Sequence, residues 1–358
     1  MQSILTVDNI SMILDFNQLF PTLNTVNTSG TIRSIPEDFK VTELNSIELS
    51  GEGEHLWLYV QKTGCNTDWV ANQLANICQV SQRQVGYAGL KDRHAVTQQW
   101  FSVQLAKITD QQLINKALPD EVTVIKSKLH SRKIKTGQLE ANQFEIVIRD
   151  IVGNKNNTQN EIEQNIQNII KNGVPNYFGP QRFGHEMRNI QKAQDWFSGN
   201  YKVKSRNLKS LLLSTSRSHI FNCIVAQRIT DKTWSNPIIG DIFQLNKSHS
   251  WFPEQDATPE EIIKRLNEFD IHITAAMAGE DCLQSTGDCA ILENSIINQF
   301  PIYQQGFEKF RLKQDRRAMR ICPIDLDFQW QDDYLTLKFK LLPGAYATGI
   351  LREVINYQ

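Results

Sequence analysis

Alternating apolar and polar residues at both ends of the chain constrain its fold most strongly. Near the C-terminus, residues 326–331 and 334–341 both alternate, and Asp332-Asp333 between them is a turn signal, so they predict a β-hairpin. Further strand patterns are spread over residues 31–149, and residues 142–149 alternate most cleanly. Pairing these strands gives a mostly antiparallel sheet with helices on one face, which is an α+β fold.

The middle of the chain carries helical periodicity instead. The polar segment at residues 154–160 is the best candidate for a linker. Beyond it, helical patterns cover residues 205–230, 258–268 and 290–299. Because 358 residues exceed one ordinary core, we expect two domains. The order predicts a discontinuous domain of residues 1–154 and 306–358, interrupted by an inserted domain of residues 155–305.

Composition excludes several classes of protein. The chain is 40% apolar and 22% charged, which is typical of a globular protein. No run of about 18 apolar residues occurs, so we expect no transmembrane helix and no membrane partner. The first residues lack the basic and apolar regions of a secretory signal. Six scattered cysteines without a CxxC pair indicate reduced thiols in the cytoplasm, with neither a disulfide framework nor a zinc site.

Basic residues are unevenly distributed on a chain whose net charge is only −1. Three segments are rich in lysine and arginine and nearly free of acids: residues 122–139, 201–230 and 309–320. If the fold brings them together, they form one electropositive surface of the kind that binds a polyanion. The alternative is three separate solvated faces. Net charge alone gives no indication of nucleic acid.

One short polar loop carries the chemistry that is easiest to interpret. It spans Gly89–Ala95, between a helical pattern and a strand-like run, and it places Asp92 between Lys91 and Arg93. Cations on both sides favour an ionised carboxylate, which suits a nucleophile better than a general acid. A solvated charged turn is the alternative interpretation, since charged loops are common.

A second loop spans Val174–Gly184 and holds two prolines, two glycines and three aromatic residues. Such a loop has a fixed, non-repetitive backbone. It is either a buried turn packed by its aromatic side chains or a support that holds Arg182 near RNA.

Six short motifs occur in order along the chain: Pro36–Phe39, Gly51–His55, Gly64–Thr67, Gly89–Ala95, Asn176–Gly184 and Leu342–Thr348. Together they resemble the D family of tRNA pseudouridine synthases (TruD). The resemblance implies an isomerase that converts uridine to pseudouridine at position 13 in the D arm of tRNA. It also implies a pseudouridine-synthase catalytic domain with an inserted α/β domain specific to the family, called the TRUD domain.

The resemblance also assigns roles to single residues. The family's nucleophile matches Asp92, and the substrate-binding positions match Phe39, Asn142 and Tyr346. Phe39 would pack in the pocket, Asn142 would hydrogen-bond, and Tyr346 would stack on a uracil that has left its stack. Bacterial members carry Phe at the position of Tyr346, so its hydroxyl leaves open a role in proton transfer from C5.

The remaining expectations concern charges and partners. Arg33 matches a basic position in the family and would pair with Asp92, while Lys91 and Arg182 are further candidates for a charge partner or an RNA contact. The resemblance implies tRNA as the partner and no cofactor or metal. We expect a monomer that needs no protein partner.

Two other functions compete with this one. The first is a non-catalytic tRNA-binding protein or RNA chaperone on the same fold, in which Asp92 would be dispensable. The second is a hydrolase that uses Asp92 with His94 or His185, which needs a positioned water and usually a metal. Binding to RNA should weaken steeply with salt, whereas binding of an uncharged substrate should not.

Overall fold

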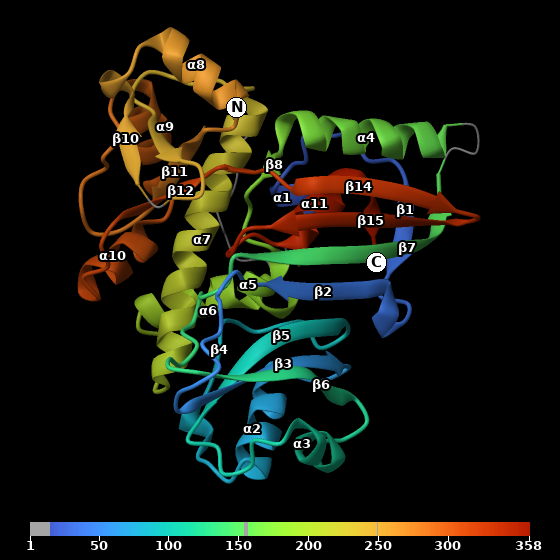
Figure 1. Cartoon of the computed structure of the whole chain (residues 1–358). Helices are drawn as coiled ribbons and strands as arrows, with labels where there is room; N and C mark the ends of the chain where they lie inside the picture. Colours follow the sequence, from blue (N-terminus) through green and yellow to red (C-terminus); the bar gives the residue numbers. More distant parts are fainter. Residues whose placement is uncertain (1–14, 154–156, 249) are drawn as a thin grey trace. The chain divides into compact units, whose positions relative to one another are not determined.

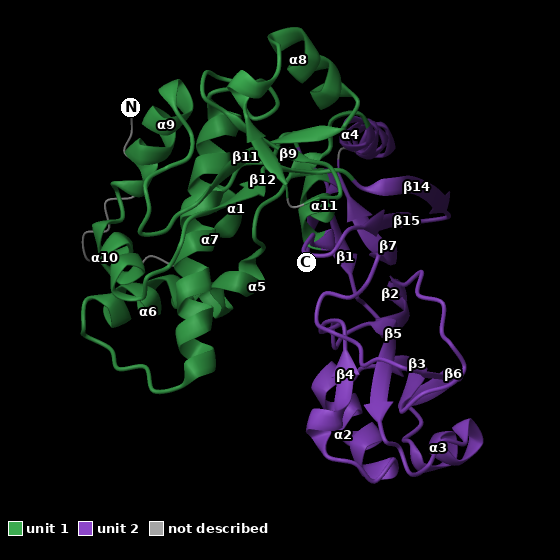
Figure 2. Cartoon of the chain, turned by 60° about the vertical axis from the view of Figure 1, so that its left-hand side comes forward, with its two compact units in different colours: residues 1–25, 171–322, 348–353 green, residues 26–170, 323–347, 354–358 purple. Residues whose placement is uncertain are grey.

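A computed structural model describes residues 15–153, 157–248 and 250–358. The chain forms two compact units, each built from segments that are distant in sequence (Figure 2). Unit 1 comprises residues 1–25, 171–322 and 348–353, and unit 2 comprises residues 26–170, 323–347 and 354–358. The boundaries that the sequence suggests for a catalytic and an inserted domain stay a prediction. Residues 154–156 of the expected linker lie outside the described residues, and a helix begins at Thr158.

Unit 2 contains a ten-stranded sheet in the order β14-β15-β7-β2-β5-β3-β6, with β1 beside β7 and β16, and β4 beside β5 (Figure 1). Its strands are β1 (Ser29–Ile32), β2 (Phe39–Leu44), β3 (His55–Thr63), β4 (Val85–Tyr87), β5 (Val96–Gln104), β6 (Val122–His130), β7 (Ala141–Val152), β14 (Ile324–Gln331), β15 (Tyr334–Leu341) and β16 (Asn356–Tyr357). Only the β2–β5 and β1–β16 pairs are parallel in the described sheet. The predicted mostly antiparallel sheet and its C-terminal hairpin are confirmed.

Strand register divides the side chains of this sheet between two faces. Phe39 lies opposite Ile146, and Glu43 lies opposite Asn142, so these four side chains share one face, which we call the Phe39 face. On the same face, apolar residues of β3, β5 and β6 pack against helices α2 (Thr67–Ile77) and α3 (Gln111–Ala117). The opposite side, which we call the Trp100 face, carries Trp57, Tyr59, Trp100, Lys126 and Lys128.

The third helix of unit 2, α4, runs from Thr158 to Asn172. Helical spacing places Ile162, Ile166, Ile169 and Ile170 on one face; the first three are buried, whereas Ile170 is exposed. Glu163 accepts a hydrogen bond of 3.0 Å from the indole of Trp330 on β14. This bond ties the helix to the hairpin strand at the edge of the sheet.

Unit 1 combines helices with a second, four-stranded sheet in the order β10-β9-β11-β12. Its strands are β9 (Ile242–Leu245), β10 (Trp251–Pro253), β11 (Ile271–Met277) and β12 (Asp315–Ala318), with a separate pair β8 (Val174–Pro175) and β13 (Arg320–Ile321). The helices are α1 (Phe16–Leu19), α5 (Pro180–Phe183), α6 (Arg188–Phe197), α7 (Arg206–Thr230), α8 (Pro259–Asn267), α9 (Gly287–Ile297), α10 (Pro301–Lys309) and α11 (Ala347–Val354). Short 3₁₀ turns cover Pro36–Asp38, Gln82–Gln84, His185–Met187 and Glu254–Asp256.

Three predicted helices of unit 1 are confirmed, and one expectation needs correction. The helix expected at residues 290–299 is α9, which runs from Gly287 to Ile297. Helix α7 fills the predicted residues 205–230, and α8 begins at Pro259, after Thr258 accepts a hydrogen bond from the Glu261 amide. Helical periodicity alone missed the four-stranded sheet of this region, which agrees instead with the α/β character that the family resemblance implies. Within the described residues, no helix is long and apolar enough to cross a membrane.

Candidate active site

The Asp92 loop joins β4 to β5 and is fixed by hydrogen bonds along its length. The side-chain amide of Gln99 donates to the backbone carbonyl of Gly89 at 3.0 Å. The backbone N–H of Lys91 donates to the hydroxyl of Thr67 at 2.9 Å. The Thr67 hydroxyl in turn donates to the side-chain oxygen of Gln99 at 3.1 Å, so the two supporting side chains are hydrogen-bonded to each other. Asp92 therefore sits on a loop whose start is anchored to α2 and β5.

Lys62 anchors the same loop from β3. Its side chain is fully buried, and its Nζ donates to the backbone carbonyls of Asp92 at 2.8 Å and Cys65 at 2.7 Å. Burial disfavours the charged ammonium and lowers the pKa of Lys62 to about 8. A buried cation thus holds the peptide group of the candidate nucleophile.

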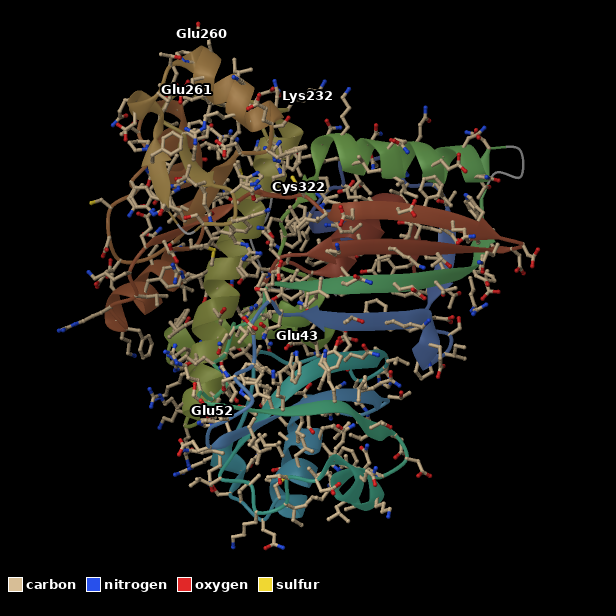
Figure 3. All side chains as sticks on the ribbon, viewed as in Figure 1. Glu43, Glu52, Lys232, Glu260, Glu261 and Cys322 are labelled. Atoms are coloured by element: carbon tan, nitrogen blue, oxygen red, sulfur yellow. The ribbon has the colours of Figure 1, made fainter. Side chains whose placement is uncertain are left out.

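A buried ion pair forms a third anchor. The Nζ of Lys91 lies 3.0 Å from Oε2 of Glu43, and these side chains are 6% and 0% exposed. The other carboxylate oxygen of Glu43 accepts a hydrogen bond of 3.3 Å from the Trp100 amide. Figure 3 marks Glu43, which lies near the end of β2. Lys91 thus bonds to the sheet, which favours a supporting role over direct contact with RNA.

The Asp92 carboxylate itself remains accessible. Its side chain is 44% exposed, and Oδ2 lies 3.1 Å from Nη2 of Arg33. The Arg33 guanidinium lies over the ring of Phe39, with 4.0 Å between Cζ and the ring centroid. Among the described residues, Oδ1 of Asp92 accepts no hydrogen bond. The carboxylate thus has one oxygen held by a cation and one that is available for chemistry.

Phe39 and Asn142 lie on neighbouring strands of the Phe39 face. The Phe39 ring is 1% exposed and meets the Phe144 ring edge to face, with 6.3 Å between centroids. Asn142 lies opposite Glu43 on β2 and Leu341 on β15. Its Oδ1 is buried without a hydrogen-bond partner among the described residues. A buried acceptor left unpaired is costly unless a ligand supplies a donor.

The last two predicted site residues lie in different units. Tyr346 belongs to unit 2, is half-buried, and follows β15 within the Leu342–Thr348 motif. Arg182 belongs to unit 1, where its guanidinium donates to the Ser214 hydroxyl at 3.1 Å and its carbonyl accepts from Thr215 at 3.2 Å. Arg33 therefore contacts both Phe39 and Asp92. Arg182 lies instead against α7 of unit 1.

Comparison with known proteins identifies the family. The sequence profile of the family described as tRNA pseudouridine synthase D (TruD) matches residues 17–194 and 185–354. The chain belongs to the TruD family. The tRNA pseudouridine synthase D of Hydrogenovibrio crunogenus is 42% identical over 329 residues, covering 92% of this chain and 93% of that protein. The protein of the same name from Methylococcus capsulatus is 39% identical over 334 residues, covering 93% and 92%.

A solved structure shows the same fold. The crystal structure from Methanosarcina mazei described as tRNA pseudouridine synthase D superposes on this TruD-family chain with a TM-score of 0.70 at 21% identity. The superposition covers 94% of this chain and 95% of the other. The resemblance and the α+β fold that the sequence predicts are thus confirmed.

Sequence reasoning missed Lys62 and Glu43, although each leaves a signal in the pattern. Lys62 occupies the strand phase of Leu58 and Val60, and Glu43 occupies the phase of Phe39. A charged residue at a position that alternation assigns to the core breaks the binary pattern, and such breaks concentrate at functional sites.

Parts of the basic segments proved to be structural in this TruD-family fold. Arg228 is buried in an ion pair with Asp241 at 2.8 Å, and Arg316 is buried in a pair with Glu293, also at 2.8 Å. Arg217 donates to a backbone carbonyl at 2.9 Å. A guanidinium has several donors, so it can satisfy buried acceptors that a lysine would leave unpaired. These three arginines therefore stabilise unit 1 rather than extend a polyanion-binding surface.

Among the described ranges, no group of three His, Cys, Asp or Glu side chains is placed to hold a metal ion.

We expect the Lys62→Met variant to have a different pH dependence of stability. The pKa of Lys62 is about 8 in the folded protein and 10.5 in its unperturbed state, so between these values the unfolded chain holds a proton that the folded chain has released. The free energy of unfolding of wild type, relative to Lys62→Met, should therefore rise from pH 8 to pH 10.5. Urea unfolding of both proteins at several pH values measures this difference. If the free energies of unfolding of the two proteins changed in parallel with pH, the lowered pKa of Lys62 would be contradicted.

Proposed function

We propose that this protein is a tRNA pseudouridine synthase that isomerises the uridine at position 13 in the D arm, with Asp92 as its nucleophile. Membership of the TruD family supports the reaction class. The observation that carries the assignment of Asp92 is its accessible carboxylate, which is paired with Arg33 at 3.1 Å on a loop anchored by Lys62 and Glu43. Such preorganisation is what a nucleophile requires.

In the proposed reaction, the bond between N1 and C1′ breaks, the uracil turns within its pocket, and C5 bonds to C1′. N1 gains a proton and C5 loses one, so the RNA keeps its composition. Asp92 supplies the nucleophilic carboxylate, and the ion pair with Arg33 holds that carboxylate in its orientation. The reaction needs no oxidant or reductant, because no electrons leave the nucleotide.

The target base must leave the RNA stack before it can reach Asp92. We propose that it enters beside the Phe39 face, where Phe39 forms the apolar wall and Tyr346 stacks on the uracil. The unpaired Oδ1 of Asn142 would accept the N3–H of uracil. A base without a donor at this position would leave the buried Oδ1 unpaired, which discriminates strongly against that base. Arg182 would contact the RNA from unit 1.

Substitutions at Tyr346 separate stacking from proton transfer. We expect Tyr346→Phe to keep its single-turnover rate within about threefold of wild type, because the ring that stacks is retained. Tyr346→Ala should lose about 5- to 160-fold, since base–aromatic stacking contributes about 1–3 kcal/mol. A large loss in Tyr346→Phe would instead assign the hydroxyl a role in moving the C5 proton.

Nucleoside analysis tests the proposed function against its two alternatives. Unmodified tRNA incubated with the protein should gain one pseudouridine and lose one uridine, with no free uracil. Release of free uracil would indicate a hydrolase. Absence of pseudouridine, together with tight and salt-sensitive binding of tRNA, would indicate a non-catalytic RNA-binding protein.

A further inference from the structure

A cavity of about 290 Å³ lies on the Trp100 face of the unit 2 sheet, away from Asp92. Trp100 is half-buried on β5, and Ile47 and Leu49 are half-buried in the segment that follows β2. The indole of Trp57, which is buried, donates to a backbone carbonyl at 2.8 Å and so fixes the floor. The volume lies just below the range of about 300–1,000 Å³ that is typical of small-molecule sites, so the cavity suits a flat group such as a single nucleobase rather than a large ligand.

Two exposed lysines on β6 line the same cavity. The Nζ of Lys126 lies 4.9 Å from the Tyr59 ring centroid and 5.2 Å from that of Trp100. Lys128 is its neighbour in register, opposite Trp57. Among the described residues, neither ammonium has a carboxylate within 4.0 Å, whereas four lysines of unit 2 form ion pairs, namely Lys40, Lys91, Lys338 and Lys340. Uncompensated cations beside aromatic rings are the signature of a single-stranded nucleic-acid site.

Asn45 supplies an independent sign that a ligand is missing. Its Oδ1 accepts a hydrogen bond of 2.9 Å from the Ile47 amide, which fixes the side chain at the cavity wall. Its Nδ2 is buried without a partner among the described residues. A buried donor of this kind is costly unless a ligand supplies an acceptor. The carbonyl oxygens and ring nitrogens of a nucleobase are such acceptors.

We propose that this cavity binds one unpaired nucleotide of the tRNA substrate, outside the catalytic centre. The base enters against Trp100, Ile47 and Leu49, Asn45 donates to its edge, and Lys126 and Lys128 bind the flanking phosphates. This inference rests on the proposed function for its ligand. It adds a second RNA-binding site on the sheet face opposite the one that carries Phe39 and Asn142.

Two variants test the cavity without touching the catalytic machinery. Ile47→Trp fills it, and Lys128→Gln removes one cation; Lys116→Gln, an exposed lysine on α3 at the Phe39 face, is the matched control for lost charge. The measurements are the Kd for unmodified tRNA at several salt concentrations, and kcat and KM for pseudouridine formation. Thermal unfolding checks that each variant is folded.

We expect Ile47→Trp to raise both Kd and KM about fivefold or more, with kcat within twofold of wild type, because one stacked base is lost. Lys128→Gln should reduce the slope of log Kd against log salt by about 0.7–0.9, which corresponds to one phosphate contact, while Lys116→Gln should keep the wild-type slope. Wild-type Kd, KM and salt slope in both folded variants would overturn the proposal. A wild-type protein that binds tRNA without forming pseudouridine would instead overturn the proposed function, and the Kd measurements would still decide the cavity.

Discussion

Asp92→Asn should abolish pseudouridine formation, with a loss of at least about 10³-fold in the single-turnover rate. The amide keeps the size and shape of the carboxylate but lacks its negative charge, so its oxygen is a much weaker nucleophile. Rapid-quench measurement with excess enzyme over unmodified tRNA isolates the chemical step from binding and release. Asp120→Asn, an exposed aspartate of the same unit, is the matched control and should react at the wild-type rate.

The same substitution should leave folding and tRNA binding nearly unchanged. The Asp92 side chain is 44% exposed, and its ion pair with Arg33 is of the exposed kind that contributes about 0.2–1 kcal/mol. The backbone carbonyl that binds Lys62 is still present in the variant. Urea unfolding and a salt titration of binding check both points. Wild-type rates in the folded Asp92→Asn variant would remove Asp92 from the reaction.

Glu43→Leu should destabilise the protein by about 3–5 kcal/mol, because it leaves the Lys91 ammonium buried without its partner. The variant also removes the carboxylate that accepts a hydrogen bond from the backbone N–H of Trp100. Because Lys91 lies next to Asp92, the Asp92 loop should shift, and pseudouridine formation should fall even below the unfolding temperature. Urea unfolding gives the loss of stability, and single-turnover kinetics at low temperature gives the loss of activity.

A double substitution supplies the control for this prediction. Glu43→Leu combined with Lys91→Met removes both charges, so it should be less destabilised than Glu43→Leu alone. Additive costs in the double variant would mean that the two side chains act independently, which would contradict the buried ion pair. The double variant should still be slow, since neither apolar side chain anchors the Asp92 loop.

Local patterns were sufficient for the parts of the fold that alternation or helical spacing specifies. The C-terminal hairpin, helix α7, and the cap and first proline of α8 all follow from neighbouring residues. The sheet of unit 1 did not, because β9 and β10 have only four and three residues. Such short strands are defined by partners far along the chain rather than by their own sequence.

In the candidate site, too, only the features that depend on neighbouring residues could be predicted from the sequence. The Asp92 loop is recognisable from its residues, and the pairing of Arg33 with Asp92 was expected only from the family resemblance. The supports from Lys62, Glu43 and Thr67 depend on strand register and on long-range contacts. Three arginines of the basic segments have partners within unit 1 that charge counting does not reveal.

The most direct test of the account is base-resolved pseudouridine mapping on unmodified tRNA, with wild type and Asp92→Ala in parallel. We predict one new pseudouridine, at position 13 of the D arm, with wild type alone. Modification by both proteins would contradict the role of Asp92. Modification at other positions only, or none with wild type, would contradict the proposed reaction itself.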